Sequence, residues 1–146
     1  MLDQFEIYIS AQKTIANYMM GLGVILILLA IVFHFVGGSS LFSGLKIGCL
    51  ILGLFSTVSG FAYKSTEDKL WVQQTKIFKE NPSEFKQVEK ARMEKVVKNF
   101  PTIQLIFVSL IIGGLISFLF IKNGFVNGLV ISLVLLLLGN ITIENV

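Results

Sequence analysis

Four stretches of about twenty residues each are almost free of charged side chains, and this pattern constrains the fold more than any other feature. Residues 18–36, 102–121 and 125–143 contain no Lys, Arg, Asp or Glu, and residues 41–63 contain only Lys46. About 20 apolar residues in a helix cross the hydrocarbon core of a bilayer. Backbone groups in lipid must be hydrogen-bonded within their own segment, which favours helices. The sequence therefore predicts an all-α polytopic membrane protein with four transmembrane helices.

Composition agrees with lipid as the solvent of this chain. Hydrophobic residues make up 54% and charged residues 14%, with a mean hydropathy of +0.80. Soluble domains average about 25% charged residues. Nine of the 12 Lys and Arg residues lie in residues 64–98, so the net charge of +3 does not spread over a basic face. These values exclude a basic nucleic-acid-binding domain and a disordered chain, and they make the lipid bilayer the expected partner.

The 146 residues form one predicted domain, residues 1–146, with four parts. Its predicted parts are an amphipathic interfacial helix over residues 1–16 that continues into the first span, a first transmembrane hairpin over residues 17–63, a cytoplasmic helical hairpin over residues 64–100, and a second transmembrane hairpin over residues 101–146. Glycine, serine and asparagine fill the two short links between spans, where a chain turns sharply.

The distribution of basic residues predicts the orientation. Residues 64–98 hold nine Lys and Arg, whereas the links at the other end hold Lys122, with Lys46 just inside the second span. Short loops rich in Lys and Arg stay in the cytoplasm. We therefore expect a multi-pass protein of the bacterial inner (plasma) membrane with cytoplasmic N- and C-termini.

The polar central segment carries a clear helix start. Asn81 is a favourable N-cap, Pro82 suits the first helical position, and Glu84 stands where a capping-box acid would. A helix over residues 82–99 follows. We expect Pro101 to kink the chain where the third span begins.

The segment before Asn81 allows two interpretations. Ser65 caps a separate amphipathic helix, or the second membrane helix continues unbroken to Lys79. In both cases two amphipathic faces pair, with Leu70, Ile77 and Phe78 against Phe85, Val88 and Val96.

The predicted spans lack the groups that membrane chemistry requires. They contain no Asp, Glu or Arg, which proton- or ion-coupled transporters use. His34, near the outer end of its span, is expected at the interface, and Lys46 is expected to reach the outer headgroups. Cys49 is the single cysteine and a predicted interior residue. The sequence therefore predicts no enzyme activity and no catalytic, cofactor-binding or metal site.

Small residues recur at helical spacing in two spans. One row contains Gly44, Gly48, Gly53, Ser56 and Gly60, and a second contains Ser109, Gly113 and Ser117. Such rows allow close approach of helix backbones. Packing within one bundle is the simpler interpretation, and homo-oligomerisation or docking of a foreign membrane helix is the alternative.

The second helix of the central segment resembles a pattern in known proteins. Asn81-Pro82-Ser83-Glu84-Phe85, Glu89, Arg92-Met93, Val96 and Asn99-Phe100 are similar to small four-helix bacterial inner-membrane proteins, among them membrane immunity proteins against interbacterial toxins. The resemblance implies a non-enzymatic protein that binds and neutralises a membrane-inserting toxin.

Three residues of the central segment are candidate partner-binding residues. Arg92 is the single arginine, and Glu89 lies one turn before it, so this pair either locks the hairpin or contacts a partner. Trp71 is a candidate interface anchor and binding residue.

Two other functions stay open at this point. A small transporter or channel subunit would need a hydrated path, and the candidate lining residues are Ser56, Thr57, Ser59, Gln104, Ser109 and Ser117. A membrane-tethered scaffold or regulator would use the hairpin at residues 64–100.

Overall fold

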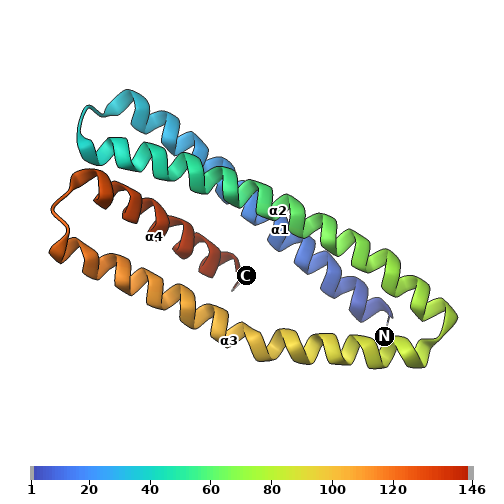
Figure 1. Ribbon diagram of the computed structural model, residues 1–146. Helices are drawn as coiled ribbons and strands as arrows, with labels where there is room; N and C mark the ends of the chain where they lie inside the picture. Colours follow the sequence, from blue (N-terminus) through green and yellow to red (C-terminus); the bar gives the residue numbers. More distant parts are fainter. Residues whose placement is uncertain (1, 145–146) are drawn as a thin grey trace.

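The computed structural model describes residues 2–144 as four long helices (Figure 1). They are α1 (Leu2–Val36), α2 (Ser40–Glu80), α3 (Pro82–Phe120) and α4 (Gly124–Glu144). No strand occurs within residues 2–144, so the predicted all-α class is confirmed. Each helix is long enough and apolar enough to cross a membrane.

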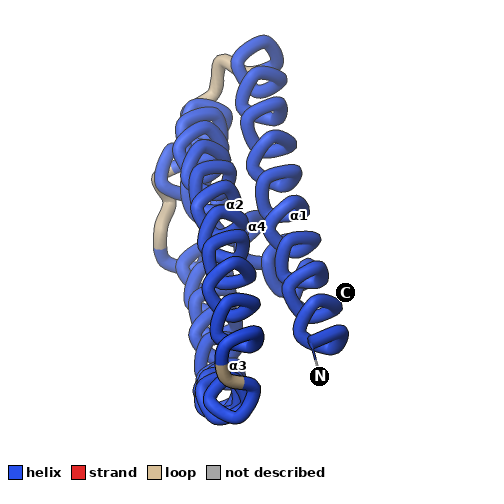
Figure 2. The backbone as a smooth tube through the Cα atoms, turned by 90° about the vertical axis from the view of Figure 1, so that its right-hand side faces the viewer, coloured by secondary structure: helices blue, strands red, loops and turns tan. Residues whose placement is uncertain are grey.

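The helices build two different halves because α4 is much shorter than the others. At a rise of about 1.5 Å per residue, the 21 residues of α4 reach only part of the way along α2, which has 41 residues. Four helices therefore lie side by side near the two short links, and three continue to the turn at Asn81 (Figures 1 and 2). The uncharged stretches occupy the four-helix half.

α2 runs unbroken from Ser40 to Glu80, so Ser65 lies inside the helix. The separate capped helix is therefore wrong, and the unbroken alternative is the one observed. Residues 2–16 likewise belong to one continuous helix with the first apolar stretch. The tertiary contacts of these long helices, described below, hold the polar turns in helical form.

Side-chain caps fix the ends of the helices as the sequence predicts at Asn81. Its Oδ1 accepts a hydrogen bond from the Glu84 amide at 3.3 Å, and Pro82 takes the first helical position. At the other end of the molecule, Ser39 Oγ accepts from the Phe42 amide, and Asn123 Oδ1 accepts from the Phe125 amide. These caps satisfy amides that a helix start leaves without partners.

The glycines of α2 bring two other helices into backbone contact. A Cβ on Gly44 would overlap the carbonyl oxygen of Phe125 in α4, and one on Gly48 would lie 2.6 Å from Ser132 Oγ. On the side of α1, a Cβ on Gly53 would lie 2.8 Å from the Gly23 carbonyl oxygen. Gly60 packs in the same way, with its Cβ position 2.9 Å from the Ala16 carbonyl oxygen. α2 is therefore the central helix, with α1 and α4 packed on it.

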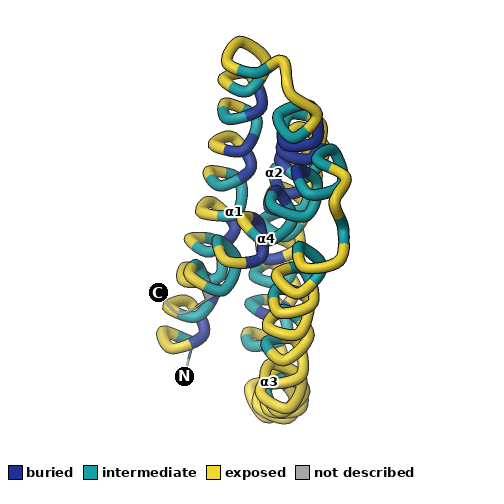
Figure 3. Tube along the Cα trace, turned by 90° about the vertical axis from the view of Figure 1, so that its left-hand side faces the viewer, coloured by how far each residue is buried: buried dark blue, intermediate teal, exposed yellow. Residues whose placement is uncertain are grey.

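α3 stays outside this packed unit. Phe85 is its one buried residue, and its apolar stretch has no buried residue at all. A Cβ on Gly114 would contact Val130 and Val134 of α4, whereas Ser109 and Gly113 are exposed. The first half of α3 is drawn almost wholly as exposed in Figure 3.

Pro101 lies inside α3 and has no amide hydrogen to donate to the preceding turn. Figure 1 shows that α3 changes direction in its middle, where the yellow part passes into the orange part. The proline is expected to bend α3 at this position. The helix does not end there but continues to Phe120.

We expect opposite effects of alanine at two glycines. Gly44→Ala lowers the free energy of unfolding by about 1–3 kcal/mol because α4 must move away from the new Cβ. Gly113→Ala raises it by about 0.4–1 kcal/mol, since alanine fits an open helical position. Denaturant unfolding of the purified protein in mild detergent measures both changes. Equal effects of the two substitutions would contradict the packing described here.

Candidate functional site

Four aromatic rings join the first turns of α1 to the α2–α3 hairpin. Phe5 stacks on Trp71 with ring centroids 5.7 Å apart, and meets Phe85 edge-on at 5.5 Å. Phe78 contacts Phe85 at 5.3 Å. Phe5 and Phe85 are buried, so this aromatic cluster of Phe5, Trp71, Phe78 and Phe85 is the apolar core of the three-helix half. Trp71, a predicted partner-binding residue, thus contacts α1 of its own chain.

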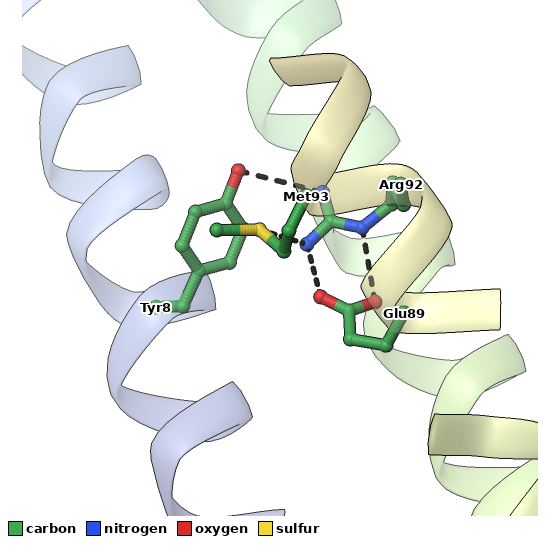
Figure 4. Close-up of polar contacts among 4 residues, drawn as sticks. All are labelled: Tyr8, Glu89, Arg92 and Met93. Atoms are coloured by element: carbon green, nitrogen blue, oxygen red, sulfur yellow. Dashed lines mark hydrogen bonds and ion pairs between the residues drawn. The ribbon is translucent and has the colours of Figure 1, made fainter. Parts of the chain in front are cut away.

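Arg92 connects α3 to α1 beside this cluster (Figure 4). Its Nε donates to Glu89 Oε2 at 3.0 Å and its Nη2 donates to Glu89 Oε1 at 2.5 Å, a two-pronged pair. Nη1 donates to the hydroxyl of Tyr8 at 3.4 Å, and the guanidinium lies 4.7 Å from the Tyr8 ring centroid. We call Tyr8, Glu89 and Arg92 the arginine clasp. The hydrogen bonds to Glu89 keep the pKa of Arg92 above its ordinary value, so the guanidinium stays protonated.

Glu67 of α2 is buried in the same half. Glu67 is 5% exposed, and its Oε2 has no hydrogen-bond partner within the described part of the chain. Burial raises the pKa of the Glu67 carboxyl, Glu89 adds to the increase, and Arg92 and Lys13 oppose it. Oε1 of Gln74, two turns further along α2, is also buried without a partner among residues 2–144. This face of α2 therefore places unpaired polar atoms inside the molecule.

The burial of Glu67 and the contact between Tyr8 and Arg92 were not identified from the sequence. In the alternative in which Ser65 caps a separate helix, Glu67 would lie in the first turn, whereas in the structure it lies inside the unbroken α2. A signal was present, because Glu67 precedes Leu70 by three residues and Gln74 by seven, the spacing of the apolar stripe. Tyr8 lies three residues after Phe5 and shares its side of α1.

Polar pairs between α1 and α2 mark the end of the apolar half. Lys13 Nζ lies 2.6 Å from Asp68 Oδ1, and the Tyr63 hydroxyl donates to Gln12. Lys64 donates from Nζ to Asn17 Oδ1 at 3.1 Å. The exposed Lys13–Asp68 ion pair contributes little free energy, but together with the two hydrogen bonds it fixes the register of the two helices.

The remaining candidate residues lie apart from the clasp. Cys49 is buried, and its Sγ donates to Ser132 Oγ at 3.4 Å in the α2–α4 contact. The His34 ring lies against Phe35, and Lys46 is partly exposed. Within residues 2–144, no three His, Cys, Asp or Glu side chains are grouped so that they could hold a metal ion.

The hydroxyls proposed to line a hydrated path do not converge. Ser56 donates to the Met19 carbonyl in the α1–α2 contact, while Thr57 and Ser117 donate to carbonyls of their own helices, those of Gly53 and Gly114. Ser109 lies exposed on α3. Ser56 and Thr57 therefore lie on α2, and Ser109 and Ser117 lie on α3.

No protein-family model, curated protein or solved structure matches this chain. The resemblance to small bacterial inner-membrane proteins therefore stays a prediction from the sequence. Two features of the molecule bear on its function: a charged clasp in the three-helix half, and an apolar stretch of α3 without buried residues.

The buried carboxyl of Glu67 makes stability depend on pH. Its pKa is raised on folding, so the folded state binds more protons than the unfolded state above about pH 4.3. The contribution of Glu67 to stability is therefore most favourable below that value and declines as the pH rises through the folded pKa. Glu67→Gln keeps the shape without the charge, so we expect a higher melting temperature at pH 8 and a flatter dependence between pH 5 and pH 8. Circular dichroism in detergent measures this, and Glu94→Gln, at an exposed position, should leave the wild-type slope unchanged.

The two-pronged pair gives Arg92 a role that lysine does not fill. Arg92→Lys keeps the charge but loses the fork and the ring contact, so we expect a loss of about 1–3 kcal/mol in the free energy of unfolding. Lys90→Gln removes the exposed pair with Glu94 and should change it by less than about 0.5 kcal/mol. Equal losses in denaturant unfolding would mean that the clasp contributes no more than a surface pair.

Proposed function

We propose that this chain is an integral protein of the bacterial inner membrane, with the α2–α3 hairpin and both termini in the cytoplasm. Four helices of sufficient length and hydropathy support insertion. The nine basic residues between positions 64 and 98 support a cytoplasmic hairpin, because short basic loops stay inside.

We further propose that the protein is a non-enzymatic immunity protein that binds the inserting helix of a membrane-active toxin. The observation that carries this proposal is the apolar stretch of α3, in which no residue is buried. A helix of the toxin that packs on this stretch would be kept from assembling into a pore. The protein would then act by binding the toxin helix and not by catalysing a reaction.

The open row on α3 supplies the contact that such a complex requires. Hydrophobicity alone does not join helices in lipid, because lipid tails are as apolar as leucine. Helices in lipid associate where small residues allow their backbones to approach closely. Ser109 and Gly113 are exposed, and a Cβ on Gly113 would meet no atom of another described element within 4 Å.

A scaffold or regulator acting through the hairpin is the second candidate. A groove of about 430 Å³ lies between α1 and α3 beside the clasp, with Phe5, Tyr8 and Met93 in its lining. Lys86 and Lys90 also line this groove, so a partner there would present acidic groups to them.

Protection of living cells tests the immunity proposal. Cells that express the wild-type protein, Gly113→Leu or Gly21→Leu are challenged with a panel of purified pore-forming bacteriocins. We expect wild type and Gly21→Leu to protect against at least one member, and Gly113→Leu to lower survival about tenfold or more, because leucine keeps the partner backbone away.

The two leucine variants are matched, since a Cβ at either glycine meets no described atom within 4 Å. Equal killing of cells with and without the wild-type protein by every bacteriocin would contradict the immunity function. Full protection by Gly113→Leu would contradict the assignment of the surface on α3. Membrane levels of each variant, measured by immunoblot, show that expression is equal.

A further inference from the structure

A groove follows the outer side of α1 next to the last turns of α4. It has a volume of about 510 Å³, and its lining includes Asn17, Tyr18, Gly21, Ile25, Gly139 and Thr142. Two glycines, one from each helix, face this region. We call it the α1–α4 groove.

Two local features keep the groove open. A Cβ on Gly139 would overlap the Leu22 side chain, at 2.6 Å from its nearest atom, so α4 lies close to α1 there. A Cβ on Gly21 would instead meet no described atom of another element within 4 Å. The groove therefore exists because Gly21 has no side chain to fill it. The close contact between α1 and α4 at Gly139 lies next to it.

The polar groups of the groove gather at one end. Gly21, Ile25 and Gly139 belong to the apolar stretches of α1 and α4, whereas Asn17 and Tyr18 lie where the apolar stretch of α1 begins. Tyr18 is 48% exposed. The Asn17 side chain accepts a hydrogen bond from Lys64 Nζ at 3.1 Å, so an ammonium group lies next to a residue that lines this end of the groove. Asn17 is neutral, and Lys64 takes part in no ion pair within residues 2–144.

We propose that the α1–α4 groove binds an anionic phospholipid, with an acyl chain along Gly21 and Ile25 and the phosphate beside Lys64, Asn17 and Tyr18. This inference rests on the membrane location in the proposed function and not on toxin binding. The groove runs from polar to apolar in the direction in which a lipid of the cytoplasmic leaflet points. A phenol at headgroup depth and a cation beside it are the groups that contact lipid phosphates.

The headgroup, more than the chain, sets the selectivity. An acyl chain gains little by leaving other lipid tails for an apolar groove, because both surroundings are equally apolar. One Lys near an anionic headgroup gives a preference of about fivefold over a neutral lipid. A second hollow continues from Tyr18 toward Glu6, whose carboxylate repels a phosphate and so favours a headgroup that stays near Lys64.

Lipid retention by the purified full chain tests this assignment. The protein in mild detergent is mixed with palmitoyl-oleoyl phosphatidylglycerol or phosphatidylcholine, and bound lipid is counted by native mass spectrometry. We expect wild type to retain one phosphatidylglycerol, about fivefold more often than phosphatidylcholine. Gly21→Leu should lower retention of phosphatidylglycerol at least fivefold, and Lys64→Gln should abolish the preference between the two lipids.

Gly113→Leu is the matched control and should retain lipid as wild type does, because Gly113 lies on α3, away from the groove. The proposal is overturned if wild type retains no lipid, if Gly21→Leu retains as much as wild type, or if Gly113→Leu loses as much as Gly21→Leu. If Lys64→Gln kept the wild-type preference for phosphatidylglycerol, the proposed position of the headgroup beside Lys64 would be wrong. Protection against bacteriocins by Gly21→Leu separates this result from the immunity proposal.

Discussion

Backbone contact along the glycine face of α2 is the constraint on which the rest of the structure depends. Gly44 and Gly48 admit α4, and Gly53 and Gly60 admit α1, each at distances that a side chain would forbid. In the proposed membrane environment, such close packing replaces the hydrophobic effect as the source of helix association. Because both helices use α2, they form one packed unit, and α3 is left to contact it at the two ends of its length.

The three-helix half is held by a different kind of interaction. Water surrounds its outer surface in the proposed orientation, so burial of Phe5 and Phe85 stabilises it by the ordinary hydrophobic effect. The arginine clasp then fixes the angle between α1 and α3 through directed hydrogen bonds. Glu67 adds a cost, because its Oε2 is buried without a hydrogen-bond partner among the described residues. The stability of the three-helix half therefore depends on pH and on substitution of its charged residues. The stability of the glycine-packed half depends on the volume of the side chains at its helix contacts.

Features encoded locally could be predicted from the sequence, and features set by helix partners could not. Hydropathy gives the four helices and Asn81 gives the turn, because capping and span length depend on neighbouring residues. The two rows of small residues carry the same local signal, yet Gly44 is packed and Gly113 is open. Only the choice of partner helix distinguishes them. The burial of Glu67 and its proximity to Arg92 likewise arise where three helices that are far apart in the sequence pack together.

The two open glycines differ in what surrounds them, and this difference argues for different occupants. Gly113 lies in the middle of a stretch without any charged residue, so a ligand there has to be apolar over its whole length, as a membrane helix is. Gly21 lies four residues from Asn17, which holds the ammonium group of Lys64, so a ligand there has to combine an apolar chain with an anionic end. A helix that packed on Gly21 would bury the charge of Lys64 against apolar side chains, at a cost that a phosphate instead removes. The presence of a charge near Gly21 and its absence near Gly113 therefore distinguish the proposed lipid surface from the proposed surface for a toxin helix.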